Sequence, residues 1–124
     1  MSGNPHILLV DDDADFRAAV ALTLRFQGHL VTEAADGRLA LIALSSGTPF
    51  QLIILDLAMP GMDGETFLAH KSRGAHAAIP VVIFSSSTSP TAKEFADVCS
   101  VVHKLDGLTG LLPAIRQASG GVHD

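Results

Sequence analysis

Five polar residues of this chain stand at or close to the ends of four predicted strands, and their chemistry suits the handling of a phosphoryl group. Asp11 and Asp12 follow one short apolar run, and Asp56 follows another. Ser85 and Lys104 follow two further runs that are rich in valine. Short runs of branched apolar residues are typical of strands that are buried on both faces of a parallel sheet. Because ligands bind at the carboxyl ends of such strands, we predict that these five side chains form one site.

Three carboxylates gathered in one place repel one another, so such a cluster either takes up protons or binds a cation. Two like charges about 4 Å apart cost roughly 4 kcal/mol at the effective dielectric of a partly buried site. Oxygen ligands favour a hard ion, and a few carboxylates with waters suit Mg²⁺. We therefore predict that Asp11 and Asp12 bind Mg²⁺ beside Asp56, and that Asp56, alone on a central strand, accepts the phosphoryl group. Ser85 would donate a hydrogen bond to that group, and Lys104 would offset its charge.

The segments between these residues alternate between strand and helix patterns. Positions 16, 19, 20, 23 and 24, all apolar except Thr23, fall on one face of a helix, which Asp13 or Asp15 can cap and Gly28 can end. Asp36 is a candidate cap for the next helix. Five strand–helix units in a row predict an α/β fold, a parallel sheet with helices on both faces. The predicted strands are 6–10, 30–34, 51–55, 79–84 and 100–103, and the predicted helices are about 16–24, 38–46, 64–74, 91–98 and 108–115.

The composition describes a globular chain and excludes several classes of function. It has 124 residues, of which 48% are hydrophobic and 17% charged, and this suits one folded domain over residues 1–124. The net charge is −5 and no cluster of lysine and arginine occurs, which argues against nucleic-acid binding. No apolar run approaches the roughly 20 residues of a membrane helix, and no signal peptide is recognisable. A cytoplasmic location is therefore expected.

Three sets of residues are expected in the core rather than in a functional site. The single cysteine, Cys99, excludes an internal disulfide and is most simply a small buried hydrophobic residue. The apolar face of the last predicted helix is expected to pack against the sheet. The same holds for five of the six phenylalanines, at positions 16, 26, 50, 67 and 84.

Several short motifs occur in an order and at a spacing that resemble one known family. They are Leu8-Leu-Val-Asp-Asp-Asp13, Glu33-Ala-Ala-Asp-Gly37, Leu55-Asp-Leu-Ala-Met-Pro-Gly-Met-Asp-Gly64, Pro80-Val-Val-Ile-Phe-Ser85 and Lys104. Together they span most of the chain, and the segment 56–64 is the most specific of them. On these residues the chain resembles the receiver domain of two-component response regulators, of the chemotaxis-regulator type.

The resemblance implies a flavodoxin-like fold with strand order 2-1-3-4-5. It also implies that Asp56 accepts a phosphoryl group from a histidine kinase or a histidine phosphotransfer protein. Mg²⁺ would be held by Asp11 and Asp12 with help from the backbone carbonyl of Ala58. Lys104 would bind the phosphate. The chain would not be a turnover enzyme on external substrates, because it would accept and slowly lose its own phosphoryl group.

The resemblance further implies how such a phosphoprotein would signal. Phosphorylation would draw Ser85, the switch hydroxyl, inward. This movement would reshape the face formed by the segments 91–98, 100–103 and 108–115. A downstream effector, a separate output domain or a second copy of the chain in a homodimer would read that face. No membrane partner is expected.

Three positions depart from the family pattern. Leu105 stands where the family usually has a proline in a cis peptide after the lysine. A cis bond before a residue other than proline costs roughly 3 kcal/mol, so we predict a trans Lys104–Leu105 bond. Val101 replaces an aromatic residue that often rotates on activation, so the usual coupling to Ser85 is not expected. Asp97 stands where glycine is usual, and the loop there is expected to differ.

Two other functions are compatible with parts of this pattern. A degenerate receiver could act as a constitutive interaction or dimerisation module, which Leu105 and Val101 would suit. A small phosphatase with an aspartyl nucleophile is the enzyme alternative. It is disfavoured because Ala58 stands two residues after Asp56, where a second acid would be needed.

Overall fold

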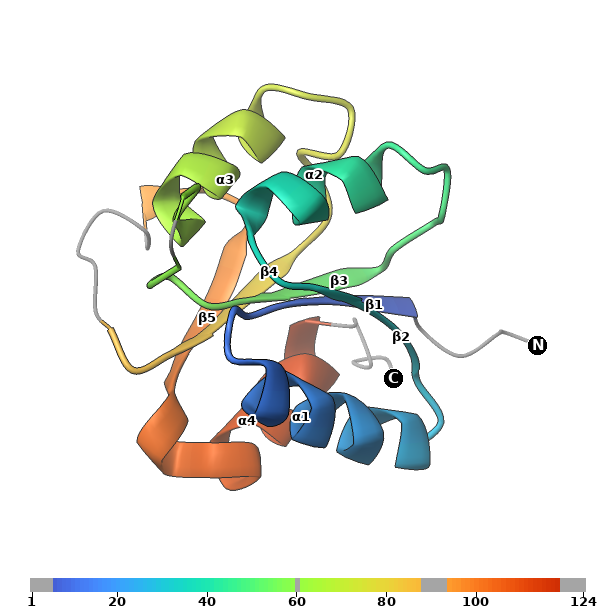
Figure 1. Ribbon diagram of the computed structural model, residues 1–124, viewed down its shortest axis with the longest axis vertical. Helices are drawn as coiled ribbons and strands as arrows, with labels where there is room; N and C mark the ends of the chain where they lie inside the picture. Colours follow the sequence, from blue (N-terminus) through green and yellow to red (C-terminus); the bar gives the residue numbers. More distant parts are fainter. Residues whose placement is uncertain (1–5, 60, 88–93, 119–124) are drawn as a thin grey trace.

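The computed structural model describes residues 6–59, 61–87 and 94–118, and Figure 1 shows a central sheet between two helical layers. All strand pairs are parallel and the strand order is β2-β1-β3-β4-β5, so the predicted order is confirmed. The strands are β1 (His6–Val10), β2 (Leu30–Ala34), β3 (Leu52–Leu55), β4 (Val81–Ser85) and β5 (Val98–His103). The helices are α1 (Ala14–Phe26), α2 (Gly37–Leu44), α3 (Gly64–Ser72), α4 (Gly107–Ala118) and the short 3-10 helix η2 (Lys104–Asp106).

The sheet has an apolar core on each of its two faces. Helices α2 and α3 cover one face, and α1 and α4 cover the other (Figure 1). Successive residues of a strand point to opposite faces. Leu8 and Ile53 therefore join the core under α2 and α3, whereas Ile7 and Ile54 join the core under α1 and α4. This double burial explains why the central strands are continuous apolar runs in the sequence.

The first helix begins and ends at the residues that the sequence indicates. The side chain of Asp13 accepts a hydrogen bond from the Phe16 N–H and caps α1. At the other end Gly28 has a φ of 97°, and the N–H groups of Gly28 and His29 donate to the carbonyls of Arg25 and Leu24. This is the bonding pattern of a Schellman motif, which favours glycine at its left-handed position. Asp36 caps α2 in the same way as Asp13 caps α1.

Three predictions need correction. The helix predicted at 91–98 is wrong for its second half, because residues 94–97 form a turn and Val98 begins β5. The first three residues of the predicted helix lie outside the described ranges. Cys99 is exposed rather than buried, because β5 is an edge strand. Phe26 is 93% exposed, since the buried face of α1 is formed by Val20, Ala21 and Leu24.

Lys71 on α3 and Asp97 before β5 form a buried ion pair that the sequence pattern did not indicate. Lys71 is 2% exposed, and its ammonium contacts an Asp97 carboxylate oxygen and donates to the carbonyl of Ala77 at 3.1 Å. The Asp97 carbonyl in turn accepts from the Val81 N–H at 2.8 Å. Asp97 therefore ties α3, β4 and the start of β5 together. The expected difference between this loop and that of the family stays a prediction.

Within the described ranges, no helix combines the length and the apolar character that crossing a bilayer requires.

The stability of the fold is expected to fall in mild acid because of His29. Its Nδ1 atom is buried and has no hydrogen-bond partner among the described residues, and burial lowers the pKa of His29 below its ordinary value of 6.5. In mild acid His29 therefore binds a proton in the unfolded chain but not in the folded chain. As a result, the free energy of unfolding decreases as the pH falls below about 6.5. In urea unfolding at pH 7.5 and 5.5, His29→Gln should lose less stability over this interval than the unaltered chain. His70→Gln, on exposed α3 surface, is the control; equal losses for both variants would contradict the prediction.

Candidate functional site

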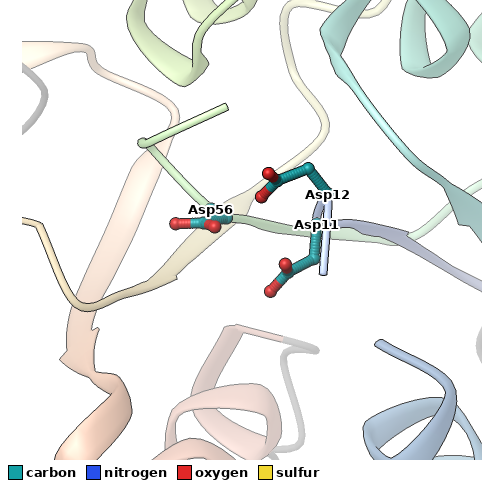
Figure 2. Close-up of side chains that lie close together, drawn as sticks. All are labelled: Asp11, Asp12 and Asp56. Carbon is teal, nitrogen blue, oxygen red and sulfur yellow. The ribbon is translucent and has the colours of Figure 1, made fainter. Parts of the chain in front are cut away.

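The backbone places the three predicted acidic residues side by side. The Asp11 N–H donates to the Ala34 carbonyl at 3.1 Å, and the Asp56 N–H donates to the Val10 carbonyl at 2.9 Å. These bonds continue the ladders of β1 with β2 and of β1 with β3 by one residue, so both aspartates leave the sheet at the same level. Figure 2 shows the carboxylates of Asp11, Asp12 and Asp56 gathered there, and one oxygen of each lies within 4.8 Å of the others. Sequence reasoning therefore identified a real cluster.

Lys104 joins this cluster from the end of β5. Its ammonium lies 2.8 Å from Asp11 Oδ2 and 3.3 Å from Asp56 Oδ2. The same nitrogen lies 4.5 Å from the centre of the Phe16 ring, at the distance of a cation–π contact. The lysine therefore bridges the two buried acids while one side of its ammonium faces an aromatic ring.

Ser85 completes the site from the end of β4. Its hydroxyl donates to Asp56 Oδ1 at 2.6 Å and accepts from the Ser87 N–H at 3.1 Å. Ser85 and Asp56 are both almost fully buried, at 2% and 4% exposure. In this conformation the Ser85 hydroxyl already contacts the Asp56 carboxylate, so the predicted inward movement of Ser85 would bring the two groups no closer.

The net charge of the cluster is negative, and it favours cations. Burial raises the pKa of Asp11, and the charge of Asp56 adds to this effect against the opposing contacts from Lys104 and the Asp13 N–H. Burial alone would lower the pKa of Lys104, but its contacts with Asp11 and Asp56 outweigh burial and raise it. The raised pKa of Asp11 is therefore mainly an effect of burial, whereas the raised pKa of Lys104 is an effect of the two carboxylates that it contacts.

The loop from Asp56 to Gly64 lies close over the end of β3. Gly64 donates its N–H to the Leu57 carbonyl at 3.0 Å, and a Cβ atom at Gly64 would lie 2.7 Å from the Leu57 Cα. Only glycine fits there, so the loop can return tightly to the strand end. The Ala58 N–H donates to Asp56 Oδ1 at 3.3 Å. The role of the Ala58 carbonyl as a metal ligand stays a prediction.

Arg17 supports Asp11 from α1, and sequence reasoning missed it. Its Nη1 donates to the Asp11 carbonyl at 2.7 Å, and its Nε donates to Glu33 Oε1 at 3.1 Å. Glu33 also pairs with Arg25 at 3.4 Å. Arg17 lies one helical turn after the cap of α1, and this position on a capped helix was the only signal for it.

The departures from the family pattern have visible consequences. No cis peptide bond occurs in the described residues, so the Lys104–Leu105 bond is trans as predicted. Leu105 is 90% exposed, and its N–H donates to His103 Nδ1 at 3.0 Å. Val101 is 43% exposed on β5. The backbone at Lys104 is therefore held by a turn that the His103 side chain caps, and not by a proline after the lysine.

Comparison with known sequences identifies a single family. Residues 7–104 match the model of the response regulator receiver domain family. Over 88 residues the chain is 41% identical to the gliding motility regulatory protein of Myxococcus xanthus and 39% identical to the two-component response regulator ORR3 of Oryza sativa subsp. indica. Each match covers 70% of this chain, but it covers 11% of the bacterial protein and 67% of the rice protein.

Solved structures agree with the sequence matches. Chemotaxis protein CheY4 of Vibrio cholerae superposes with a TM-score of 0.81 at 30% identity, covering 94% of this chain and 99% of that one. Response regulator protein TrrA of Thermotoga maritima has a TM-score of 0.79 at 22% identity, covers 92% of this chain and 98% of its own, and shares the fold. One explanation accounts for the order of the strands, for the acidic cluster with its lysine and hydroxyl, and for these matches. The chain belongs to the family of response regulator receiver domains of two-component systems.

Proposed function

We propose that this receiver accepts a phosphoryl group on Asp56 in a reaction that depends on Mg²⁺. The observation that supports this most strongly is the set of contacts around one carboxylate. Lys104 and Ser85 contact different oxygens of Asp56, and two further carboxylates lie within 4.8 Å. A positive charge, a hydroxyl donor and a cation site around one nucleophile are what phosphoryl transfer requires.

In the transfer step this chain supplies the acceptor and the stabilising groups, and the donor is a phosphorylated histidine of a partner protein. A carboxylate oxygen of Asp56 forms a bond to phosphorus while the bond from phosphorus to the donor imidazole nitrogen breaks. The donor imidazole keeps the electron pair and takes up a proton from solvent. Lys104 and the Ser85 hydroxyl stabilise the oxygens of the transferred group. Within this proposal the chain loses that group slowly by hydrolysis and does not turn over external substrates.

The donor set at this site fits Mg²⁺. Asp11, Asp12 and Asp56 offer oxygen ligands only, and Asp12 is exposed, which leaves room for the waters that Mg²⁺ keeps. The ion would offset the negative charge of the phosphoryl oxygens. TrrA of Thermotoga maritima has been crystallised with Mg²⁺ and a beryllium fluoride. The same pair of reagents is therefore a suitable probe for this chain.

We further propose that phosphorylation changes the face around β5 and α4 and so controls a protein partner. The donor would be a histidine kinase or a histidine phosphotransfer protein, and the reader would be an effector protein, an output domain or a second copy. Ser85 connects Asp56 to β4, and β4 pairs with β5 through Ser85 and His103. Since Val101 offers no aromatic ring, the change would travel through the β4–β5 ladder.

The proposal predicts a covalent adduct that depends on one side chain. After incubation with a small phosphodonor and Mg²⁺, the intact mass should rise by about 80 Da, the mass of one phosphoryl group. Asp56→Asn should show no adduct, because an amide is a far weaker nucleophile than a carboxylate. Asp63→Asn is the matched control, since Asp63 caps α3 outside the cluster, and it should keep the adduct.

The same experiment separates the proposal from the alternative of a constitutive interaction module. The exposed Val101 and the absent proline after Lys104 are the observations that favour the alternative. A folded, unaltered chain that gains no adduct at any Mg²⁺ concentration would support it. An adduct of equal amount in Asp56→Asn would contradict both readings of the site.

A further inference from the structure

Lys104 is held without the proline that the family pattern contains, and the structure contains a substitute. The residue after it, Leu105, is almost fully exposed and packs against nothing that could fix the lysine. The backbone is instead fixed by the turn η2, in which His103 Nδ1 accepts the Leu105 N–H at 3.0 Å. This turn orients the peptide, but it does not contact the long lysine side chain, which is held by other residues.

Phe16 restricts that side chain. The centre of its ring lies 4.5 Å from the Lys104 ammonium, while Asp11 and Asp56 contact the same nitrogen at 2.8 and 3.3 Å. Phe16 is itself held in place. The centre of its ring lies 5.7 Å from the centre of the Phe84 ring, and Phe16 stands in the first turn of the capped helix α1. The Phe16 ring, packed on Phe84, therefore gives the Lys104 ammonium a third neighbour besides the two carboxylates.

We propose that Phe16 is a positioning residue for Lys104, whose ring holds the ammonium over the acidic cluster in place of a rigid proline after the lysine. An aromatic face attracts a cation without competing for its hydrogen bonds. The three N–H donors of Lys104 thus remain directed at Asp11, Asp56 and an incoming phosphoryl group. The effect on phosphoryl binding rests on the proposed function, whereas the effect on the lysine itself does not.

The first test measures Lys104 directly and needs no phosphate. The ε-methylene protons of Lys104 should resonate upfield of ordinary lysine values, since they lie near the ring. In Phe16→Leu they should return to ordinary values, and in Phe16→Tyr they should stay upfield. Phe26→Leu is the matched control, because it makes the same change on the same helix at an exposed position. Lys104 shifts that are the same in Phe16→Leu and in the unaltered chain would overturn the proposal.

The second test measures affinity for beryllofluoride in the presence of Mg²⁺. Phe16→Leu should bind about three- to tenfold more weakly than the unaltered chain, and Phe16→Tyr and Phe26→Leu should bind within twofold of it. In a Lys104→Met background, Phe16→Leu should have no further effect, because the ring acts through the lysine. An equal loss in that background would mean that Phe16 only supports the fold, and this result would overturn the proposal.

The two tests also separate this inference from the proposed function. If the unaltered chain binds no beryllofluoride but the Lys104 shifts respond to Phe16→Leu, the proposed function fails and the positioning role stands. If the unaltered chain binds beryllofluoride and Phe16→Leu binds it equally well, the positioning role fails and the proposed function stands.

Discussion

Replacing Lys71 by methionine is expected to lower the free energy of unfolding by about 3–5 kcal/mol, the usual cost of leaving a buried charge without its partner. Lys71 and Asp97 are both inaccessible, with side-chain exposures of 0% and 7%. Methionine keeps most of the apolar stem of lysine, so little packing is lost. The Asp97 carboxylate and the Ala77 carbonyl would both lose the ammonium as a donor. Such an effect is large beside a total stability of about 5–15 kcal/mol.

Urea unfolding followed by circular dichroism at pH 7 measures this effect. Arg73→Met is the control, because Arg73 is exposed at the end of the same helix and its replacement should change stability by no more than about 0.5 kcal/mol. A double variant that also replaces Asp97 by leucine should be more stable than Lys71→Met alone, because no unpaired charge remains. A loss below 1 kcal/mol in Lys71→Met would mean that this pair does not anchor the start of β5.

Replacing Asp12 by asparagine is expected to weaken Mg²⁺ binding by at least about tenfold, because one of three charges that attract the ion is removed. Within the described ranges Lys104 pairs with Asp11 and Asp56 but not with Asp12. Asp12 is also exposed, so its replacement disturbs no packing. Without metal, the Asp12→Asn variant should therefore be as stable as the unaltered chain or slightly more stable, since the repulsion between carboxylates in the cluster decreases.

Calorimetric titration with Mg²⁺ gives the affinity, and urea unfolding without metal gives the stability. Asp15→Asn is the matched control, because Asp15 is exposed in the first turn of α1 and does not belong to the cluster. Its Mg²⁺ affinity should stay within twofold of the unaltered value. An Asp12→Asn variant that binds Mg²⁺ as tightly as the unaltered chain would exclude Asp12 as a ligand.

Those parts of the fold that depend on local signals were predictable. Strands β1 and β3 are buried on both faces, and such strands appear in a sequence as continuous apolar runs. The acids after them had to lie at one edge of the sheet, since parallel strands end on the same side. The caps Asp13 and Asp36 follow from the preference of helix starts for a short acceptor side chain.

Features that depend on distant contacts were not predictable in the same way. Lys71 does stand on the inner face of α3, because it lies at helical spacing from the other buried residues of that helix. These residues are Gly64, Phe67 and Leu68. Lysine is seldom buried, however, and its partner lies 26 residues further along the chain. The contact of Phe16 with Lys104 joins residues that are far apart in the sequence and has no local signal. Cys99 and Phe26 were misplaced because an edge strand and a helix end expose residues that elsewhere would be buried.

The most direct test of the central claim is to find where the phosphoryl group resides. Borohydride reduces an aspartyl phosphate to the corresponding alcohol, homoserine, and peptide mass spectrometry then identifies the position. After treatment with a small phosphodonor, we expect reduction at Asp56 when Mg²⁺ is present and no reduction when a chelator has removed it. A phosphoryl group found on a histidine or on another acid, with Asp56 unreduced, would contradict the assignment of this site.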